Sequence, residues 1–191
     1  MLSKTGLIGI NNKMGIEYEH YPVLLTFSVL AVDTDSIEQV KGKLEDVWDT
    51  VIVSSSVVPF LYTSYYCDEM GRDILRVYFG TDLLVDAGTI AAIKLRTNAI
   101  ENEYLRDCKR TVNIDPGYLT LAKFVLATTK DATHRVYIGN KIYAESTLYF
   151  QNGTFMPWQW TYPDYRSEHA IGFFTILRSG YYARIKRLKY I

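Results

Sequence analysis

A nearly continuous apolar run extends from Val23 to Val32 and is interrupted by only two hydroxyl residues. A strand that is buried on both faces shows such a run instead of an alternation, so this segment is predicted to be central in a sheet. Helical spacing of apolar residues follows, at Ile37, Val40, Leu44, Val47 and Trp48. Asp35 is predicted to cap this helix, with Glu38 as its reciprocal partner.

Further strands are predicted at Thr50–Pro59, Tyr62–Cys67 and Ile74–Phe79, which are bounded by turn residues. In the last of them, apolar side chains alternate with Arg76 and Tyr78. This alternation indicates a sheet with one wetter face, and both residues are expected on that face.

Two more helices are predicted from their apolar stripes. The first is capped by Asp86, and its apolar side consists of Ile90, Ile93, Thr97, Ile100 and Tyr104. Its polar remainder consists of Lys94, Arg96, Asn98, Glu101 and Glu103. The second is capped by Ser167, and its stripe consists of Ala170, Phe173, Phe174, Leu177, Tyr181, Ile185 and Leu188.

The segment between these helices is harder to interpret. Thr111–Ile114 is predicted to be short and extended, and Asp115-Pro116-Gly117 is predicted to turn the chain, because proline fixes one turn angle and glycine accepts a positive φ at the next. After the turn, Thr120 is predicted to cap a short helix. A strand is the alternative, since the residues that follow include β-branched ones.

A hairpin is predicted to join His134–Ile138 to Ile142–Phe150 through a three-residue loop. This register sets Arg135 opposite Glu145 and pairs apolar with apolar residues, whereas a two-residue loop would set His134 opposite Glu145. His134 and Arg135 are expected to point to opposite faces of their strand. The aromatic segment Phe155–Trp160, which contains a proline, is predicted to be an edge strand or irregular.

Groups of antiparallel strands separated by helices define the α+β class. We predict a single, mainly antiparallel sheet with helices mostly on one face, with a ferredoxin-like core and an added C-terminal hairpin as the expected arrangement. Residues 1–191 are expected to form one domain. In the N-terminal extension, residues 1–20, only Leu7–Ile10 indicates a short edge strand.

Composition excludes several functional classes. The chain has 191 residues, 48% of them hydrophobic, and its formal net charge is zero, which argues against a protein devoted to nucleic acid. It has no apolar stretch of the roughly 20 residues that cross a membrane, so we expect a cytoplasmic protein. Cys67 and Cys108 are far apart, and we expect free thiols, with a disulfide as the alternative. No P-loop, dinucleotide-binding, nucleophile-elbow or HExxH motif is present.

The candidate catalytic residues are Asp115, His134 and Glu145. The pKa of a histidine lies near working pH, so His134 is the acid–base candidate. Asp115 and Glu145 are carboxylates that can serve a base or a divalent cation, although no dedicated metal site is predicted. Each has a structural alternative: Asp115 can form an Asx-turn, His134 can lie hydrogen-bonded at a strand end, and Glu145 can be the partner of Arg135.

The candidate ligand-binding residues are Asn113, Arg135, Tyr162 and Asp164. Arg135 presents a guanidinium fork that fits a phosphate or a carboxylate. Asn113 shares one side of an extended segment with Asp115. Tyr162 and Asp164 belong to an aromatic group that can stack a ring, or simply close the end of the core.

The segments that contain these residues resemble an uncharacterised prokaryotic family, domain-of-unknown-function family 4416. The resemblance is carried by the motifs NIDPGYLT (113–120), LATTKD (126–131), HR (134–135), IYAE (142–145) and WTYPDYR (160–166). It covers the C-terminal half of the chain well and the N-terminal quarter weakly. It implies that these segments belong together, and it supplies no catalytic assignment and no cofactor.

We therefore expect an enzyme or a binding protein for a small anionic ligand. The alternative is a module without enzymatic activity that binds RNA or protein through the basic residues of the last helix, Arg178, Arg184, Lys186, Arg187 and Lys189. Sixteen tyrosines leave a structural subunit or homo-oligomer open, because tyrosine is frequent at interfaces.

Overall fold

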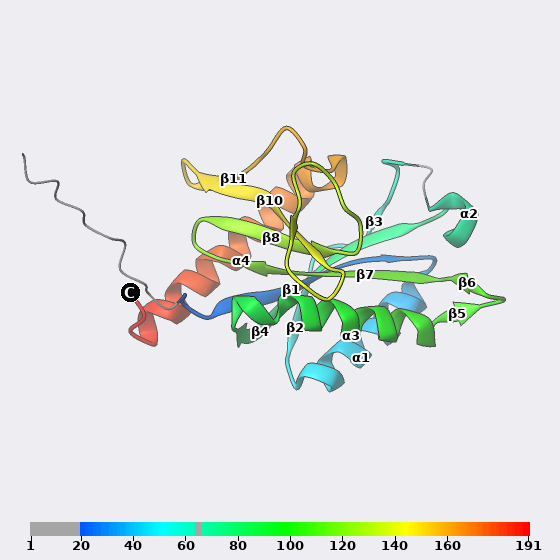
Figure 1. The fold of residues 1–191 in the computed structure, drawn as a ribbon, viewed down its shortest axis with the longest axis horizontal. Coiled ribbons are helices and arrows are strands. Elements are labelled where there is room, and N and C mark those ends of the chain that lie inside the picture. The colour runs from blue at the N-terminus through cyan, green and yellow to red at the C-terminus, as the bar shows by residue number, and fades with distance from the viewer. Residues whose placement is uncertain (1–19, 64–65) are drawn as a thin grey trace, which may run out of the picture.

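The computed structural model describes residues 20–63 and 66–191, so the predicted strand at Leu7–Ile10 lies outside the described residues. Its main sheet has the strand order β11-β10-β8-β7-β1-β4-β2, with β3 paired to β4 and β9 paired to β10 (Figure 1). These strands are β1 (Val23–Ala31), β2 (Ile52–Ser54), β3 (Val58–Pro59), β4 (Leu75–Val85), β7 (Val112–Leu119), β8 (Lys123–Thr128), β9 (Val136–Tyr137), β10 (Tyr143–Gln151) and β11 (Thr154–Pro157). All of their pairings are antiparallel, which confirms the predicted class.

The remaining elements lie around this sheet. The α-helices are α1 (Thr34–Trp48), α2 (Cys67–Met70), α3 (Ile90–Glu103) and α4 (Glu168–Arg187). The 3-10 turns are η1 (Ala87–Thr89) and η2 (Pro163–Arg166), and a separate small hairpin consists of β5 (Leu105–Arg106) and β6 (Lys109–Arg110). In the described part of the chain, no helix combines the length and the hydrophobicity that crossing a membrane requires.

Strand β1 is central, as its apolar run predicts. It lies between β4 and β7, and all nine of its residues are buried. Its side chains alternate between two cores: Phe27 and Val29 pack with α1 and α3, whereas Leu24 packs with α4. Apolar cover on both faces explains why the sequence of this strand shows no hydrophobic alternation.

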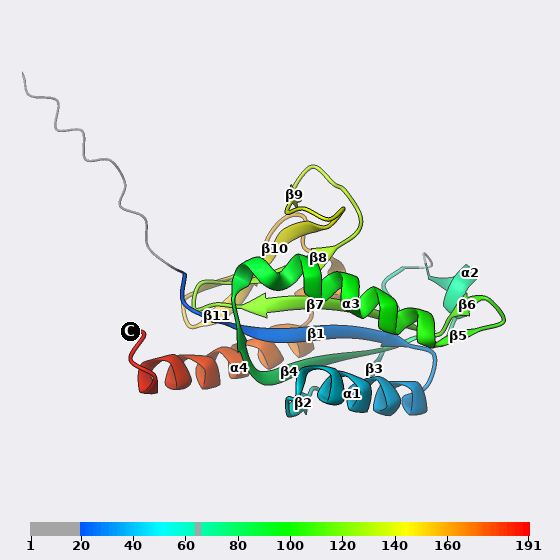
Figure 2. The same ribbon diagram turned by 60° about the horizontal axis from the view of Figure 1, so that its bottom comes forward.

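The helices cover the two faces of the sheet unequally. α1 and α3 pack on one face and α4 crosses the other, as Figure 2 shows. The prediction that helices lie mostly on one face is therefore confirmed. The ferredoxin-like core stays a prediction; the relevant observation is the strand order β7-β1-β4-β2, with α1 and α3 on one side.

Three predictions before β4 were wrong. The cap of α1 is Asp33 and not Asp35, because Asp33 has an extended backbone and its carboxylate accepts a hydrogen bond from the Ser36 amide at 2.7 Å. The segment predicted as one strand at Thr50–Pro59 forms two short strands, β2 and β3, which pair with different parts of β4. The described residues of Tyr62–Cys67 form no strand, and α2 begins within this segment.

The predicted Pro-Gly turn was also wrong, because β7 continues through Asp115, Pro116 and Gly117 and pairs with β1 throughout. Proline is tolerated because β8 pairs with β7 only from Gly117 onwards, so the missing N–H lies at an unpaired edge. Gly117 is required for close approach, since a Cβ atom there would lie 2.7 Å from the Val125 carbonyl oxygen. Strand pairing across the sheet thus overrides local turn chemistry.

The alternative for the next segment was the correct one: β8 is a strand and not a helix. Thr120 caps no helix; its hydroxyl accepts hydrogen bonds from the amides of Ala122 and Lys123 and so stabilises the turn between β7 and β8. The pairing of this strand with β7 and β10 explains its β-branched and aromatic residues.

The C-terminal predictions fit better. Val136 lies opposite Ala144, which is the register that the three-residue loop sets. The aromatic segment contains an edge strand, β11, and Ser167 caps α4 by accepting a hydrogen bond from the Ala170 amide. His134 and Arg135, however, precede β9 instead of lying within it, so strand alternation does not apply to them.

Candidate functional site

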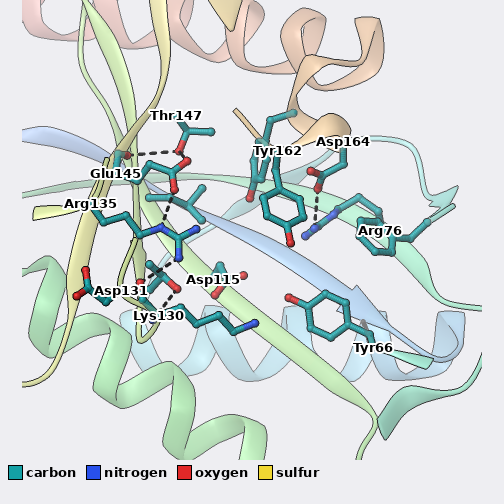
Figure 3. A pocket seen from close by; sticks show the side chains of 14 residues that line it. Tyr66, Arg76, Asp115, Lys130, Asp131, Arg135, Glu145, Thr147, Tyr162 and Asp164 are labelled. Atoms are coloured by element: carbon teal, nitrogen blue, oxygen red, sulfur yellow. Dashed lines mark hydrogen bonds and ion pairs between the residues drawn. The ribbon is translucent and has the colours of Figure 1, made fainter. Parts of the chain in front are cut away.

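A pocket of about 210 Å³ opens on the sheet face that carries α4, beside η2 (Figure 3). Five of the seven predicted site residues line it: Asp115, Arg135, Glu145, Tyr162 and Asp164. They come from β7, from the segment before β9, from β10 and from the residues around η2, so the fold brings together side chains that are far apart in the sequence.

An ion pair between Arg76 and Asp164 lies at the base of this pocket. Both side chains are buried, with 6% and 1% exposed, and Arg76 Nη2 lies 2.7 Å from Asp164 Oδ2. The guanidinium carbon also lies 5.1 Å from the ring centre of Phe60, 5.5 Å from Tyr78 and 5.7 Å from Tyr165. Asp164 is therefore a buried countercharge at the base of the pocket.

The hydrogen bonds of Arg76 are incomplete. Within the described part of the chain, its Nε and Nη1 atoms and Asp164 Oδ1 have no hydrogen-bond partner. Burial by itself would lower the pKa of Arg76, but the charge of Asp164, together with smaller contributions from Tyr165, Tyr78 and Asp115, more than offsets this effect and raises the pKa. The base of the pocket thus carries a permanent guanidinium with hydrogen-bonding capacity to spare.

A second group of contacts surrounds Glu145 in the pocket wall. Its Oε2 atom accepts a hydrogen bond from Arg135 Nε at 2.8 Å and lies 3.1 Å from His134 Nε2, and its Oε1 lies 3.3 Å from the Thr147 hydroxyl. Arg135 also donates from Nη1 to the Lys130 carbonyl. The predicted pair of Arg135 and Glu145 therefore exists, but it is part of a larger network.

His134 contacts Glu145 from outside the pocket. It does not line the pocket, and its ring stacks on Trp160 with a centroid distance of 5.7 Å. His134 and Arg135 reach the same carboxylate oxygen, so the expectation that they point to opposite faces was wrong.

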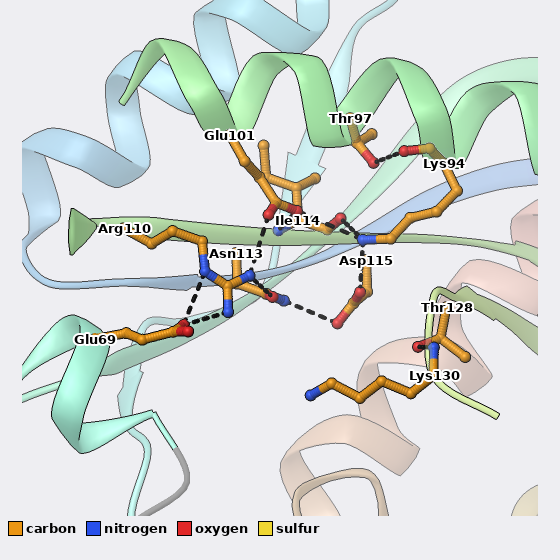
Figure 4. Close-up of polar contacts among 10 residues, drawn as sticks. All are labelled: Glu69, Lys94, Thr97, Glu101, Arg110, Asn113, Ile114, Asp115, Thr128 and Lys130. Atoms are coloured by element: carbon orange, nitrogen blue, oxygen red, sulfur yellow. Dashed lines mark hydrogen bonds and ion pairs between the residues drawn. The ribbon is translucent and has the colours of Figure 1, made fainter. Parts of the chain in front are cut away.

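A third network joins Asp115 to helix α3 (Figure 4). The Lys94 ammonium lies 2.9 Å from Asp115 Oδ1, 3.5 Å from Glu101 Oε1 and 2.8 Å from the Ile114 carbonyl oxygen, while Glu101 accepts a hydrogen bond from the Ile114 amide at 2.8 Å. These two side chains occupy the edge of β7 where β8 does not pair with it. They therefore take the place of a neighbouring strand for the backbone of Ile114.

A second compartment of about 270 Å³ adjoins the first pocket along α3 and β7. Both are lined by Tyr66, Asp115, Thr128 and Lys130, and Asn113 lines only the second. The amide of Asn113 donates to Asp115 Oδ2 at 2.9 Å, so Asn113 positions this shared carboxylate. We call the first space the Arg76 pocket and the second the Asn98 compartment. Each name is that of a residue that lines this space and not the other.

The pKa of Asp115 is lowered from its ordinary value of 3.8. Burial opposes ionisation, but the charge and hydrogen bond of Lys94 and the charge of Arg76 outweigh it. A carboxyl group whose pKa is lower in the folded state stabilises the fold above its unfolded pKa, and this stability is lost as the pH falls through the folded value.

Acidification should therefore weaken wild type more steeply than the variant Asp115→Asn. We expect the free energies of unfolding of the two proteins to converge as the pH falls below about 4, because the unfolded carboxyl group takes up a proton there while the folded one is still ionised. Urea unfolding at a series of pH values measures both curves. Asp131→Asn is the control, since Asp131 is exposed and has no ion-pair partner among the described residues. Parallel curves for wild type and Asp115→Asn would contradict the linkage.

Sequence reasoning missed Arg76, Lys94 and Glu101. Arg76 and Tyr78 were expected on a wetter face, and Lys94 and Glu101 on the polar side of α3, but all four are buried. Lys94 and Glu101 are seven residues apart, which is two helical turns and was a usable signal that they share a face. Arg76 had no local signal, because its partner Asp164 is distant in the sequence.

Two of the basic residues of α4, Arg178 and Arg184, lie on the sheet side of the helix. Arg178 donates to the Leu121 carbonyl, and its guanidinium carbon lies 3.5 Å from the ring centre of Phe150; Arg184 donates to the Asp82 carbonyl. Both side chains therefore help to pack α4 on the sheet. The hypothesis of an RNA-binding face gains no support from these two residues.

The described residues thus define an α+β protein with a polar pocket built on ion pairs at one sheet face. Residues 21–181 match the model of the family described as Domain of unknown function (DUF4416), and the chain belongs to this family. No curated protein and no solved structure matches the chain. Within the described ranges, no three His, Cys, Asp or Glu side chains come together in a group that could hold a metal ion.

Proposed function

We propose that the Arg76 pocket binds a small polar molecule that carries an anionic group. The observation that supports this most directly is the buried guanidinium of Arg76, which lines the pocket and, among the described residues, pairs with one carboxylate only. Buried polar groups in proteins nearly always have hydrogen-bond partners, so a group with unused capacity beside a pocket requires an explanation. A bound anion in the pocket provides one.

Two more cationic side chains support the same ligand class. Lys130 and Arg135 line the pocket, and Lys130 Nζ lies 5.4 Å from the ring centre of Tyr66. Three carboxylates that line the pocket are already engaged, Asp115 with Lys94, Glu145 with Arg135, and Asp164 with Arg76. A negative group in the pocket therefore meets no uncompensated carboxylate at these three positions. Asp131, the fourth carboxylate of the lining, is exposed and has no ion-pair partner among the described residues.

The contacts favour binding over acid–base catalysis. Glu145 is engaged by three side chains, which suits a role in holding Arg135 in place. The lowered pKa of Asp115 makes it a weak base, and His134 lies outside the pocket. Catalysis by Asp115, His134 and Glu145 stays a prediction, and so does a ligand-binding role of Asp164, which pairs with Arg76. Ligand binding by Arg135 and Tyr162 is what the geometry supports best.

Binding of simple anions tests this proposal. Orthophosphate, sulfate and acetate should raise the thermal unfolding temperature in a concentration-dependent way, because a ligand that binds only the folded state stabilises it. Lys130→Gln should weaken the affinity about tenfold, as the loss of a charged hydrogen bond costs about 1.5 kcal/mol. Titration calorimetry measures both affinities.

Lys123→Gln is the matched control. Lys123 is exposed at the start of β8, whereas Lys130 follows the end of that strand; Lys123 does not line the Arg76 pocket, so its variant should bind like wild type. If none of the three anions binds in the millimolar range, or if the two lysine variants weaken binding equally, the proposed anion site is wrong.

A further inference from the structure

The Asn98 compartment differs chemically from the Arg76 pocket, although the two spaces share four lining residues. Its charged groups are satisfied within the protein. Arg110 donates to Glu69, to Glu101 and to the side-chain oxygen of Asn113, and the Lys94 ammonium has three oxygen partners. A second anion in this compartment would thus find Lys94 and Arg110 already occupied.

Two neutral amides remain available there. Asn98 and Asn102 both line the compartment and lie one helical turn apart on α3, so they share a face of the helix. Among the described residues, neither side chain has a hydrogen-bond partner. Each amide presents a carbonyl oxygen and an NH₂ group, so the pair offers donors and acceptors side by side.

Hydroxyl groups are the ligand atoms that match this pattern. A hydroxyl donates one hydrogen bond and accepts others, so neighbouring hydroxyls of one molecule can use both functions of an amide. Thr129 adds a further hydroxyl to the lining, and the shared wall contributes the Tyr66 phenol. Burial raises the pKa of Tyr66, so this phenol stays neutral and can donate.

We infer that the Asn98 compartment binds the hydroxyl-bearing part of a ligand whose anionic group lies in the Arg76 pocket. This inference rests on the proposed function and specifies its ligand class, a polyhydroxylated anion such as a sugar acid or a sugar phosphate. Asp115 and Lys130 line both spaces and lie where the two parts of such a ligand join.

Paired ligands test this inference by calorimetry. Gluconate is compared with hexanoate, and glucose 6-phosphate with hexyl phosphate, so that each pair shares its anionic group and differs in hydroxyls. We expect the hydroxylated member of at least one pair to bind ten times more tightly or better. The pair that shows this preference identifies the anionic group as a carboxylate or a phosphate.

Variants on α3 test whether the preference for hydroxylated ligands arises in the Asn98 compartment. The double variant Asn98→Ala/Asn102→Ala should lose most of the tenfold preference and keep the wild-type affinity for orthophosphate. Leu95→Ala is the control, because Leu95 is exposed on the same helix and lines neither space. It should bind all ligands like wild type.

The outcomes separate the two proposals. If orthophosphate or acetate binds but neither hydroxylated ligand exceeds its alkyl counterpart, the inference is wrong and the proposed function stands. An unchanged preference in the double variant also overturns the inference. If no anion binds at all, the proposed function itself fails.

Discussion

Replacement of Asp164 by alanine should lower the free energy of unfolding by about 3–5 kcal/mol, the typical cost of removing one member of a buried ion pair. The variant leaves the Arg76 guanidinium buried with neither its countercharge nor the acceptor that lies 2.7 Å away. The three surrounding rings contact the guanidinium in wild type as well, so they do not replace the lost countercharge.

Urea unfolding followed by fluorescence measures this change. Asp131→Ala is the matched control, since it removes an exposed carboxylate from the same pocket and should change stability by no more than about 0.5 kcal/mol. The double variant Arg76→Met/Asp164→Leu should recover much of the lost stability, because it removes both charges together. A loss below about 1 kcal/mol in Asp164→Ala would show that Arg76 is not isolated from solvent in the way the structure indicates.

Lys94→Met is expected to destabilise the protein by a similar amount, about 3–5 kcal/mol. Lys94 is only 3% exposed and is the countercharge of both Asp115 and Glu101. Without its ammonium, the two carboxylates face each other in a buried site, and the Ile114 carbonyl oxygen loses its partner. Methionine retains most of the volume of the lysine side chain, so the loss of stability results from the missing charge and not from a cavity.

Lys43→Met provides the comparison, because the ion pair of Lys43 and Glu103 is largely exposed and should contribute at most about 1 kcal/mol. The pH dependence supplies a second measurement. The pKa of Asp115 should rise in Lys94→Met toward its unfolded value, so the loss of stability on acidification that this carboxylate causes in wild type should shrink in the variant. Equal effects of the two lysine variants would refute a structural role for the buried network.

The sequence predicted those elements whose own pattern determines them. The apolar run of β1, the stripes of α1, α3 and α4, and the loop of the β9–β10 hairpin all depend on residues that are close in sequence. Periodicity reports which face is buried, and burial is what these elements share.

The errors arose where distant pairing decides the conformation. Asp115-Pro116-Gly117 has the composition of a turn, but eight consecutive pairs with β1 hold this strand extended. In the same way, β8 has a sequence that fits a helix or a strand, and two neighbouring strands determine the outcome.

The sequence allowed several residues that line the candidate site to be predicted, but not the buried charged residues at its base. Arg135 and Glu145 are close in the hairpin register, and Asp115 and Asp164 lie in distinctive motifs. Arg76 and Lys94 lie on strands and helices that appear ordinary, and a charged residue in such a position is normally exposed. Only the folded structure shows that the countercharge of each lies on another element.

The contacts of Lys94 and Glu101 with Ile114 also bear on association between copies of the chain. A strand edge with free N–H and C=O groups can pair with a strand of another molecule and so begin aggregation. Here the amide and the carbonyl of Ile114 are both occupied by side chains of α3, at 2.8 Å each. Strand β8 leaves this part of β7 unpaired and so makes room for the pocket. The ion pair of Lys94 and Glu101 stabilises the site and also blocks the addition of another strand at this edge.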